Sequence, residues 1–119
     1  MKLEYFTLDE FDSPDSPESG KFMSEEFLIA LDEARDIAGI PFKINSGYRT
    51  IEHNANVGGV STSSHMYGLA ADVHCTKSRE RFIMIAAFIA AGFTRIGIGK
   101  TFIHVDLDKD KDQSVAWLY

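Results

Sequence analysis

The chain has 119 residues, of which 45% are hydrophobic and 12% aromatic, so it can bury one compact core and is not a disordered segment. Its formal net charge of −6 at pH 7 gives no electrostatic basis for binding nucleic acid. The single cysteine, Cys75, excludes an intrachain disulfide, and no apolar stretch reaches membrane-spanning length. We therefore expect a monomer without membrane insertion. The acidic segment Met1 to Glu10 does not resemble a signal peptide, which predicts synthesis in the cytoplasm without one.

Residues 1–23 contain two of the three prolines and are expected to form an irregular N-terminal arm. A helix is predicted from Ser24 to Ala38, because Ser24 can cap it, acidic residues follow the cap, and Gly39 can end it. The apolar stripe predicted for this helix comprises Phe27, Leu28, Leu31, Ala34, Ile37 and Ala38.

The rest of the chain alternates short strands with one more long helix. Strands are expected at 41–45, 69–74, 93–99, 102–107 and 115–119, with a helical turn at 51–56 and a hairpin turn at 99–101. The second helix is predicted at 77–91, with Phe82, Ile85, Ala86 and Ile89 facing inward. These elements favour a single α+β domain over residues 1–119, with a small antiparallel sheet packed with helices.

Three residues have the chemistry of a metal site. His65 and Asp72 lie seven positions apart, and His104 lies on a later apolar run. Two imidazoles and one carboxylate can supply the three protein ligands of a catalytic zinc site, whose fourth position holds water. The chain has no HExxH motif, so the fold must bring these ligands together from separate elements.

Alternation along the two predicted strands indicates how this can happen. Asp72 lies on one face of its strand, and His104 and Asp106 share one face of theirs. If the strands are neighbours, Asp72 and His104 can hold a metal between them. His65 would complete the site from the preceding loop, where Gly68 allows a tight turn. A lone strand histidine is more often structural, but the combination of three such residues is harder to dismiss.

Three segments carry a resemblance to a known family: Ser46-Gly-Tyr-Arg49, then Ser63-x-His65-x-x-Gly68-x-Ala70-x-Asp72, then His104-Val-Asp106. In this order and spacing they resemble the zinc D-alanyl-D-alanine carboxypeptidase family, from about Glu10 to the C-terminus. The small single-domain branch of phages and bacteria is the nearest match, and hedgehog signalling domains share the fold. The resemblance implies zinc bound by His65, Asp72 and His104, Arg49 at the substrate end of a cleft, and peptidoglycan stem peptides as substrate. Action at the cell wall would then require release or delivery by another factor.

Further residues have two open interpretations each. Arg49 can grip a substrate carboxylate or oxyanion, or form a structural salt bridge. Ser63 can contact substrate or cap its loop. Asp106 can orient His104 or serve as an acid–base group.

The chain departs from the family at Thr101, because several members carry an acidic general base three positions before the last histidine. Asp106, His74 and His53 are the candidates to replace that base. The alternative function is a zinc-binding module that binds wall peptides without cleaving them. Carboxypeptidase and endopeptidase activities both remain open.

Other motifs predict no further site. The run Asp106-x-Asp108-x-Asp110-x-Asp112 lacks the glycine and the final glutamate of a calcium loop, so we expect a solvated charged loop. The pairs Gly58-Gly59 and Gly97-x-Gly99 precede no helix that would make them phosphate-binding motifs.

Overall fold

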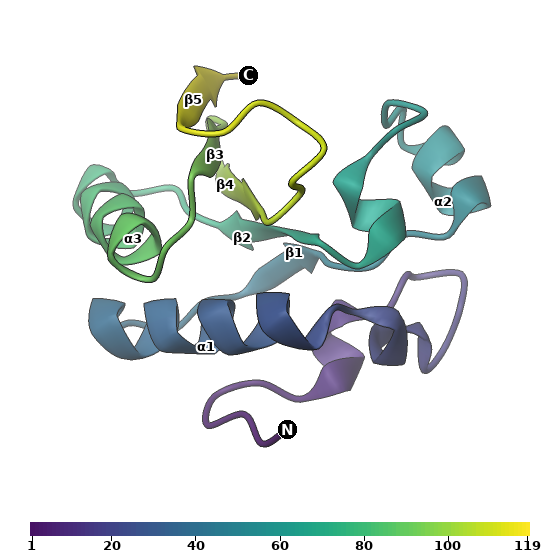
Figure 1. Ribbon diagram of the computed structural model, residues 1–119, viewed down its shortest axis with the longest axis horizontal. Coiled ribbons are helices and arrows are strands. Elements are labelled where there is room, and N and C mark those ends of the chain that lie inside the picture. The colour runs from purple at the N-terminus through teal and green to yellow at the C-terminus, as the bar shows by residue number, and fades with distance from the viewer.

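The computed structural model describes residues 1–119 as one five-stranded sheet with helices (Figure 1). The elements are α1 (Glu25–Ala38), β1 (Ile44–Ser46), α2 (Ile51–Asn56), β2 (Ala70–His74), α3 (Ser78–Ala90), β3 (Arg95–Ile98), β4 (Phe102–Asp106) and β5 (Val115–Leu118), with single-turn 3-10 helices at η1 (Leu8–Phe11), η2 (Ser19–Phe22) and η3 (Ser64–Tyr67). The predicted α+β class is confirmed. No helix has both the length and the apolar character needed to cross a membrane.

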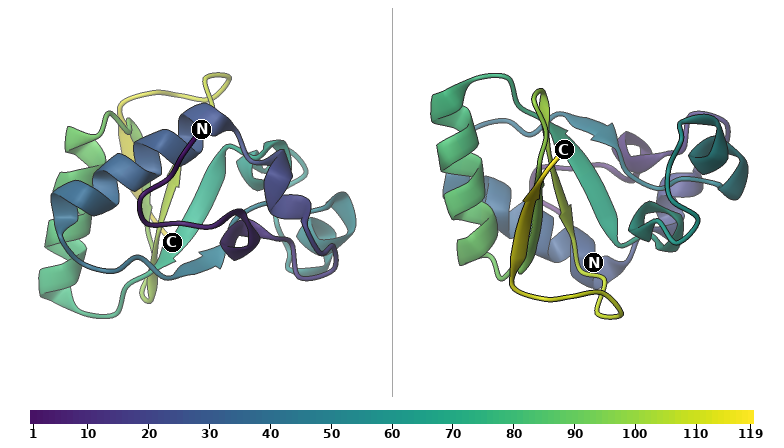
Figure 2. Two further views of the ribbon diagram at one scale, coloured as in Figure 1. Left: turned by 90° about the horizontal axis from the view of Figure 1, so that it is seen from below. Right: turned by 90° about the horizontal axis from the view of Figure 1, so that it is seen from above.

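The strands are ordered β1-β2-β4-β3-β5 and pair antiparallel, except that β5 runs parallel to β3. The helices α1 and α3 lie side by side against one face of this sheet (Figure 2). Alternation along the strands sends Val73, Ile103 and Val105 into the core beneath those helices. The opposite face therefore carries Asp72 and His104.

Helix α1 begins and ends where the sequence predicts. The Ser24 hydroxyl accepts a hydrogen bond from the backbone N–H of Phe27, and Gly39 adopts a φ of 67° at the C-terminal end. Four residues of the predicted stripe are buried and Ala38 is half-buried against the core, whereas Ile37 is 48% exposed. Ile37 lies roughly 110° from the centre of the buried stripe at about 100° per residue, so its place in the stripe was wrong.

The inward face predicted for α3 was wrong at Phe82, Ala86 and Ile89, whereas Ile85 is half-buried and packs against the core. The helix buries Met84, Ala87 and Phe88, while Phe82 is 76% exposed and Ile89 61%. Ten consecutive residues, 82–91, are apolar, so periodicity alone could not select the buried side. Packing selected it, because the ring of Phe88 contacts those of Phe42 and Phe93.

Residues 1–23 have little regular structure but do not form a separate arm. They contribute Phe6, Phe11 and Met23 to the core. The carbonyl of Phe11 accepts a hydrogen bond from the backbone of Tyr48, which lies beside the predicted Arg49 site. A Cβ on Gly47 would come within 2.7 Å of the Phe11 backbone, so glycine permits this close packing. The N-terminal segment thus holds the chain that leads into the site.

Candidate functional site

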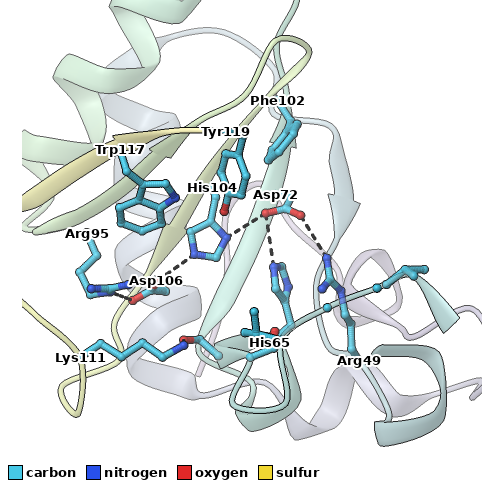
Figure 3. A pocket seen from close by; sticks show the side chains of 16 residues that line it. Arg49, His65, Asp72, Arg95, Phe102, His104, Asp106, Lys111, Trp117 and Tyr119 are labelled. Carbon is cyan, nitrogen blue, oxygen red and sulfur yellow. Dashed lines mark hydrogen bonds and ion pairs between the residues drawn. The ribbon is translucent and has the colours of Figure 1, made fainter. Parts of the chain in front are cut away.

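His65, Asp72 and His104 come together on the face of the sheet opposite α1 and α3 (Figure 3). Asp72 on β2 pairs directly with His104 on β4, so their side chains are neighbours on one face. His65 approaches from η3, which ends at Gly68 with a φ of 70°. One ligand atom from each of the three residues lies within 4.8 Å of the others. This cluster, which we call the triad, is the arrangement that the sequence predicted from alternation.

Each histidine of the triad is oriented by a contact outside it. Nδ1 of His65 donates to the carbonyl of Gly47 at 2.8 Å, and Nε2 then lies 3.3 Å from Oδ1 of Asp72. Nε2 of His104 lies 2.7 Å from Oδ2 of Asp106, and Nδ1 lies 2.9 Å from the same Asp72 oxygen. One nitrogen of each ring is therefore held by an outer acceptor while the other faces Asp72. Metal-binding histidines in proteins are commonly held in this way.

Burial and charge oppose each other in the triad. Burial alone would raise the pKa of Asp72, but hydrogen bonds and positive charge from His104 and His65 leave that pKa well below its usual value. Burial would lower the pKa of His104, yet its hydrogen bonds to Asp106 and Asp72 raise it. The pKa of Asp106 falls despite burial, because His104, the backbone N–H of Asp108 and Arg95 stabilise its charge. Without a metal, the site therefore favours a charged imidazole between two carboxylates.

Arg49 lies beside the triad and makes three side-chain contacts. Nη2 is 3.3 Å from Oδ2 of Asp72, Nε donates to Ser46 at 3.0 Å, and Nη1 donates to Asn54 at 3.3 Å. A structural salt bridge was one of the two roles considered for Arg49, and the structure contains it, with Asp72 as the partner. A guanidinium has five N–H donors, so two remain for a substrate oxygen.

Asn54, which the sequence did not indicate, connects Arg49 to the rim of the cleft. Its side chain is buried, with Oδ1 accepting from Arg49 and Nδ2 donating to the carbonyl of Val60 at 2.9 Å. A Cβ on Gly59 would lie 2.0 Å from Oδ1 of Asn54, so only glycine fits there. Gly59 thus serves close packing against Asn54, whereas Gly58 supplies a turn residue with a φ of 73°.

The acidic run after β4 is not the solvated loop that was expected. Asp106 is 1% exposed and its Oδ1 accepts from Nε of Arg95 at 2.8 Å, while Asp108 is buried and accepts from the Ser64 hydroxyl at 2.7 Å. Only Asp110 and Asp112 are exposed. The expectation failed because sequence gave no indication that Arg95 and Ser64 would lie opposite these carboxylates. The loop therefore braces both His104 and the helical turn that carries His65.

A cleft of about 430 Å³ opens above the triad. Its side chains include three cations (Arg49, Arg95 and Lys111), three aromatic rings (Phe102, Trp117 and Tyr119) and two carboxylates (Asp72 and Asp106). Ser63 also lines it, although its hydroxyl accepts from the backbone of His65 as a helix cap.

The other residues considered for proton transfer lie elsewhere. Thr101 and His74 are exposed, His53 is half-buried on α2, and none of the three lines the cleft. Asp106 is thus the only one of the candidate bases that does.

Arg95, Trp117 and Tyr119 also line the cleft without having been singled out from sequence. Alternation within the predicted strand 115–119 places Trp117 and Tyr119 on one face, which could have signalled them. The pattern did not reveal that β5 joins the sheet beside β3, and that pairing brings both rings to the triad.

Comparison with known proteins agrees with this geometry. The family model described as Peptidase M15 matches residues 4–106. The zinc D-Ala-D-Ala carboxypeptidase of Streptomyces albus G is 54% identical over 33 residues, which cover 28% of this chain and 13% of that protein. The chain therefore matches only a small part of this relative, while the family model spans most of the chain, including the whole triad. On that match, the chain belongs to the peptidase family M15.

Proposed function

We propose that this protein is a zinc-dependent peptidase that hydrolyses peptidoglycan stem peptides. The observation that carries the proposal is the orientation of the triad. His65 Nε2, His104 Nδ1 and Asp72 Oδ1 converge, while Gly47 and Asp106 hold the outer nitrogens of the two rings. The relative from Streptomyces albus G is a zinc D-Ala-D-Ala carboxypeptidase, which supports the metal and the substrate class.

The donor set fits zinc. Two imidazole nitrogens and one carboxylate oxygen are the protein ligands of catalytic rather than structural zinc sites, and a zinc ion held by them would border the cleft and be open to water. Bound there, zinc would lower the pKa of a water molecule and polarise the scissile carbonyl. The protein's contribution is orientation: Asp106 accepts from His104, Gly47 accepts from His65, and Arg49 holds the second oxygen of Asp72.

The cations of the cleft support a substrate that carries a carboxylate. Arg49, Arg95 and Lys111 line the cleft, and each is paired with one carboxylate, that of Asp72, Asp106 and Asp108 respectively. The free donors of Arg49 suit a carboxylate or the oxyanion that forms at the attacked carbonyl. Stem peptides carry carboxylates, and we propose that the protein reaches them at the cell wall after release.

Asp106 is better suited to positioning than to proton transfer. Its Oδ2 contacts His104, and its Oδ1 accepts from Arg95 and from the backbone of Asp108. These three contacts engage three of the about four lone-pair sites of the carboxylate, and its Oδ2 is directed at the ring of His104. We therefore propose that Asp106 holds His104 in place, and that Ser63 acts chiefly as the cap of η3.

The absence of a free carboxylate in the cleft favours one alternative function. Asp72 and Asp106 are the only acidic lining residues, and both are engaged within the site. A module that holds zinc and binds wall peptides without cleaving them is consistent with this arrangement.

Digestion of purified peptidoglycan separates the two functions. We expect the zinc-loaded protein to release new amino termini or free D-alanine, and mass spectrometry of the fragments to identify the bond that is cut. A chelator should stop the release, and added zinc should restore it. Zinc binding and peptide binding without any product would establish the module instead.

A further inference from the structure

A wall of aromatic side chains borders the cleft on the side of the triad away from Arg49 (Figure 3). It consists of Phe102 on β4 and of Trp117 and Tyr119 at β5, and we call it the aromatic wall. The ring centroids of Phe102 and Tyr119 are 5.0 Å apart, and those of Trp117 and Tyr119 are 6.3 Å apart. The Trp117 ring lies 5.6 Å from that of His104, so the wall is continuous with the triad.

Two glycines, Gly97 on β3 and Gly99 in the turn that follows it, make room for these rings. A Cβ on Gly97 would lie 2.6 Å from the Tyr119 ring and 2.7 Å from Trp117 Nε1, and a Cβ on Gly99 would lie 2.3 Å from the Phe102 ring. The three rings therefore lie directly on the backbone of β3 and of the turn after it. Neither glycine has a positive φ, so close packing and not backbone conformation requires them. The Gly97-x-Gly99 motif thus provides the backbone surface on which the three rings of the aromatic wall pack.

The wall is fixed in place yet reachable from the cleft. The Arg95 guanidinium lies 4.9 Å from the Trp117 ring, and Asp106 and the carbonyl of Asp112 hold that guanidinium. The backbone N–H of Tyr119 donates to the carbonyl of Ile98, while its side chain is 67% exposed. Trp117 and Tyr119 also lie beyond residues 4–106, the range that the family model matches. Two of the three rings of the wall are therefore additional to the matched region, and Phe102 lies within it.

Charge determines what the wall can bind. The Arg95 guanidinium already lies over the Trp117 ring, so a second cation stacked on that ring would be repelled by it. A substrate carboxylate would be attracted to Arg49 instead of to the rings. An uncharged, apolar group is the remaining class, since it gains by covering aromatic surface.

We propose that the aromatic wall is a substrate subsite for an uncharged, apolar side chain, on the side of the scissile bond opposite the carboxylate that faces Arg49. This proposal rests on the proposed peptidase function and adds the orientation of the bound peptide. The peptide would cross the triad with its carboxyl end toward Arg49 and its acyl portion against Phe102, Trp117 and Tyr119.

Equilibrium binding tests the subsite without turnover. Trp117 is the only tryptophan of the chain, so its fluorescence reports on ligands in the cleft. Chelator-treated protein would be titrated with diacetyl-L-lysyl-X-D-alanine, where X is glycine, D-alanine or D-leucine. We expect the dissociation constant to fall about threefold to fourfold from glycine to D-alanine, as burial of one methyl group implies. D-leucine should bind at least as tightly as D-alanine.

Two variants should remove this discrimination. Tyr119→Ala removes part of the wall, and Gly97→Ala displaces the rings of Trp117 and Tyr119. In both we expect the glycine and D-alanine peptides to bind within about twofold of each other, because the methyl group loses its apolar partner. Tyr67→Ala is the matched control, since Tyr67 is exposed and does not line the cleft. Circular dichroism would verify that each variant is folded.

The results of these titrations distinguish failure of the proposed subsite from failure of the proposed peptidase function. Wild-type discrimination that persists in folded Tyr119→Ala overturns the subsite, as does a wild-type protein that binds all three peptides equally or none of them. If discrimination is present and depends on Tyr119 while zinc-loaded protein leaves peptidoglycan intact, the subsite stands and the peptidase function fails.

Discussion

The histidines of the triad depend on contacts that fix which ring nitrogen faces Asp72 and the proposed zinc site. His104→Ala removes one of three proposed zinc ligands, and we expect it to lose most of the roughly one zinc per chain that such a site holds. Metal analysis of the purified variants would measure this. His74→Ala is the control, because His74 is exposed on the neighbouring strand and does not line the cleft. Full zinc retention in both His65→Ala and His104→Ala would refute the assignment.

Asp106 gives a second prediction at the scale of one residue. The Asp106→Asn variant still offers the His104 ring a hydrogen-bond acceptor of similar size. The negative charge of the Asp106 carboxylate is lost. We expect zinc affinity to fall about 10- to 100-fold, with turnover recovering when zinc is raised, because outer carboxylates set the orientation and basicity of the ligand. Zinc titration at several fixed substrate concentrations would measure both. A hundredfold loss of turnover at unchanged zinc affinity would instead make Asp106 the proton acceptor.

At the scale of elements, α2 links Arg49 to the rim of the cleft through Asn54. Asn54→Ala removes the hydrogen bonds to Arg49 and to the carbonyl of Val60. We expect KM to rise about tenfold with a smaller change in kcat and unchanged zinc content, since two modest hydrogen bonds position Arg49 and the rim. Asn56→Ala on the same helix, where the side chain is exposed, is the control. Equal kinetics in the two variants would show that Asn54 only stabilises the fold.

Helix α3 offers a matched pair of phenylalanines. Phe88 is fully buried against Phe42 and Phe93, while Phe82 is largely exposed. Phe88→Ala should lower the free energy of unfolding by about 3–5 kcal/mol, as loss of a core aromatic ring implies. Phe82→Ala should change it by about 0.5 kcal/mol or less. Denaturant titration of both variants checks this, and similar losses in the two would mean that the helix packs through its other face.

At the scale of the whole molecule, the buried charges of the site connect stability to pH. In metal-free protein the pKa values of Asp72 and Asp106 lie below the ordinary 3.8, so their contribution is present above that value and is lost as pH falls through the folded pKa. The pKa of His104 lies above the ordinary 6.5, so its contribution is complete below 6.5 and is lost as pH rises through the folded pKa.

Metal-free protein should therefore be most stable between about pH 4 and pH 6.5. Zinc requires neutral imidazoles, so the extra stability that zinc confers should grow with pH across the same range. Denaturation midpoints measured with chelator and with zinc from pH 2 to pH 9 would test both statements. A metal-free midpoint that rises steadily from pH 6 to pH 9 contradicts the assigned shift of His104.

Sequence determined the features that depend on local spacing. Ser24 and Gly39 define α1 because capping acts within one helical turn. Alternation placed Asp72 and His104 on one face of each strand, since side chains of a strand repeat every two residues. The motifs around Arg49, His65 and His104 indicated the family that the match over residues 4–106 then established.

Tertiary structure alone decided which distant residues meet. The buried side of α3 depended on Phe42 and Phe93, because a helix that is apolar all round has no preferred face of its own. The partners of Asp106 and Asp108 came from β3 and η3, and Asn54 met Arg49 and the rim. The parallel pairing of β5 with β3 carried Trp117 and Tyr119 to the triad. Local periodicity assigns a side chain to a face, but only the pairing and packing of the whole chain choose what lies opposite that face.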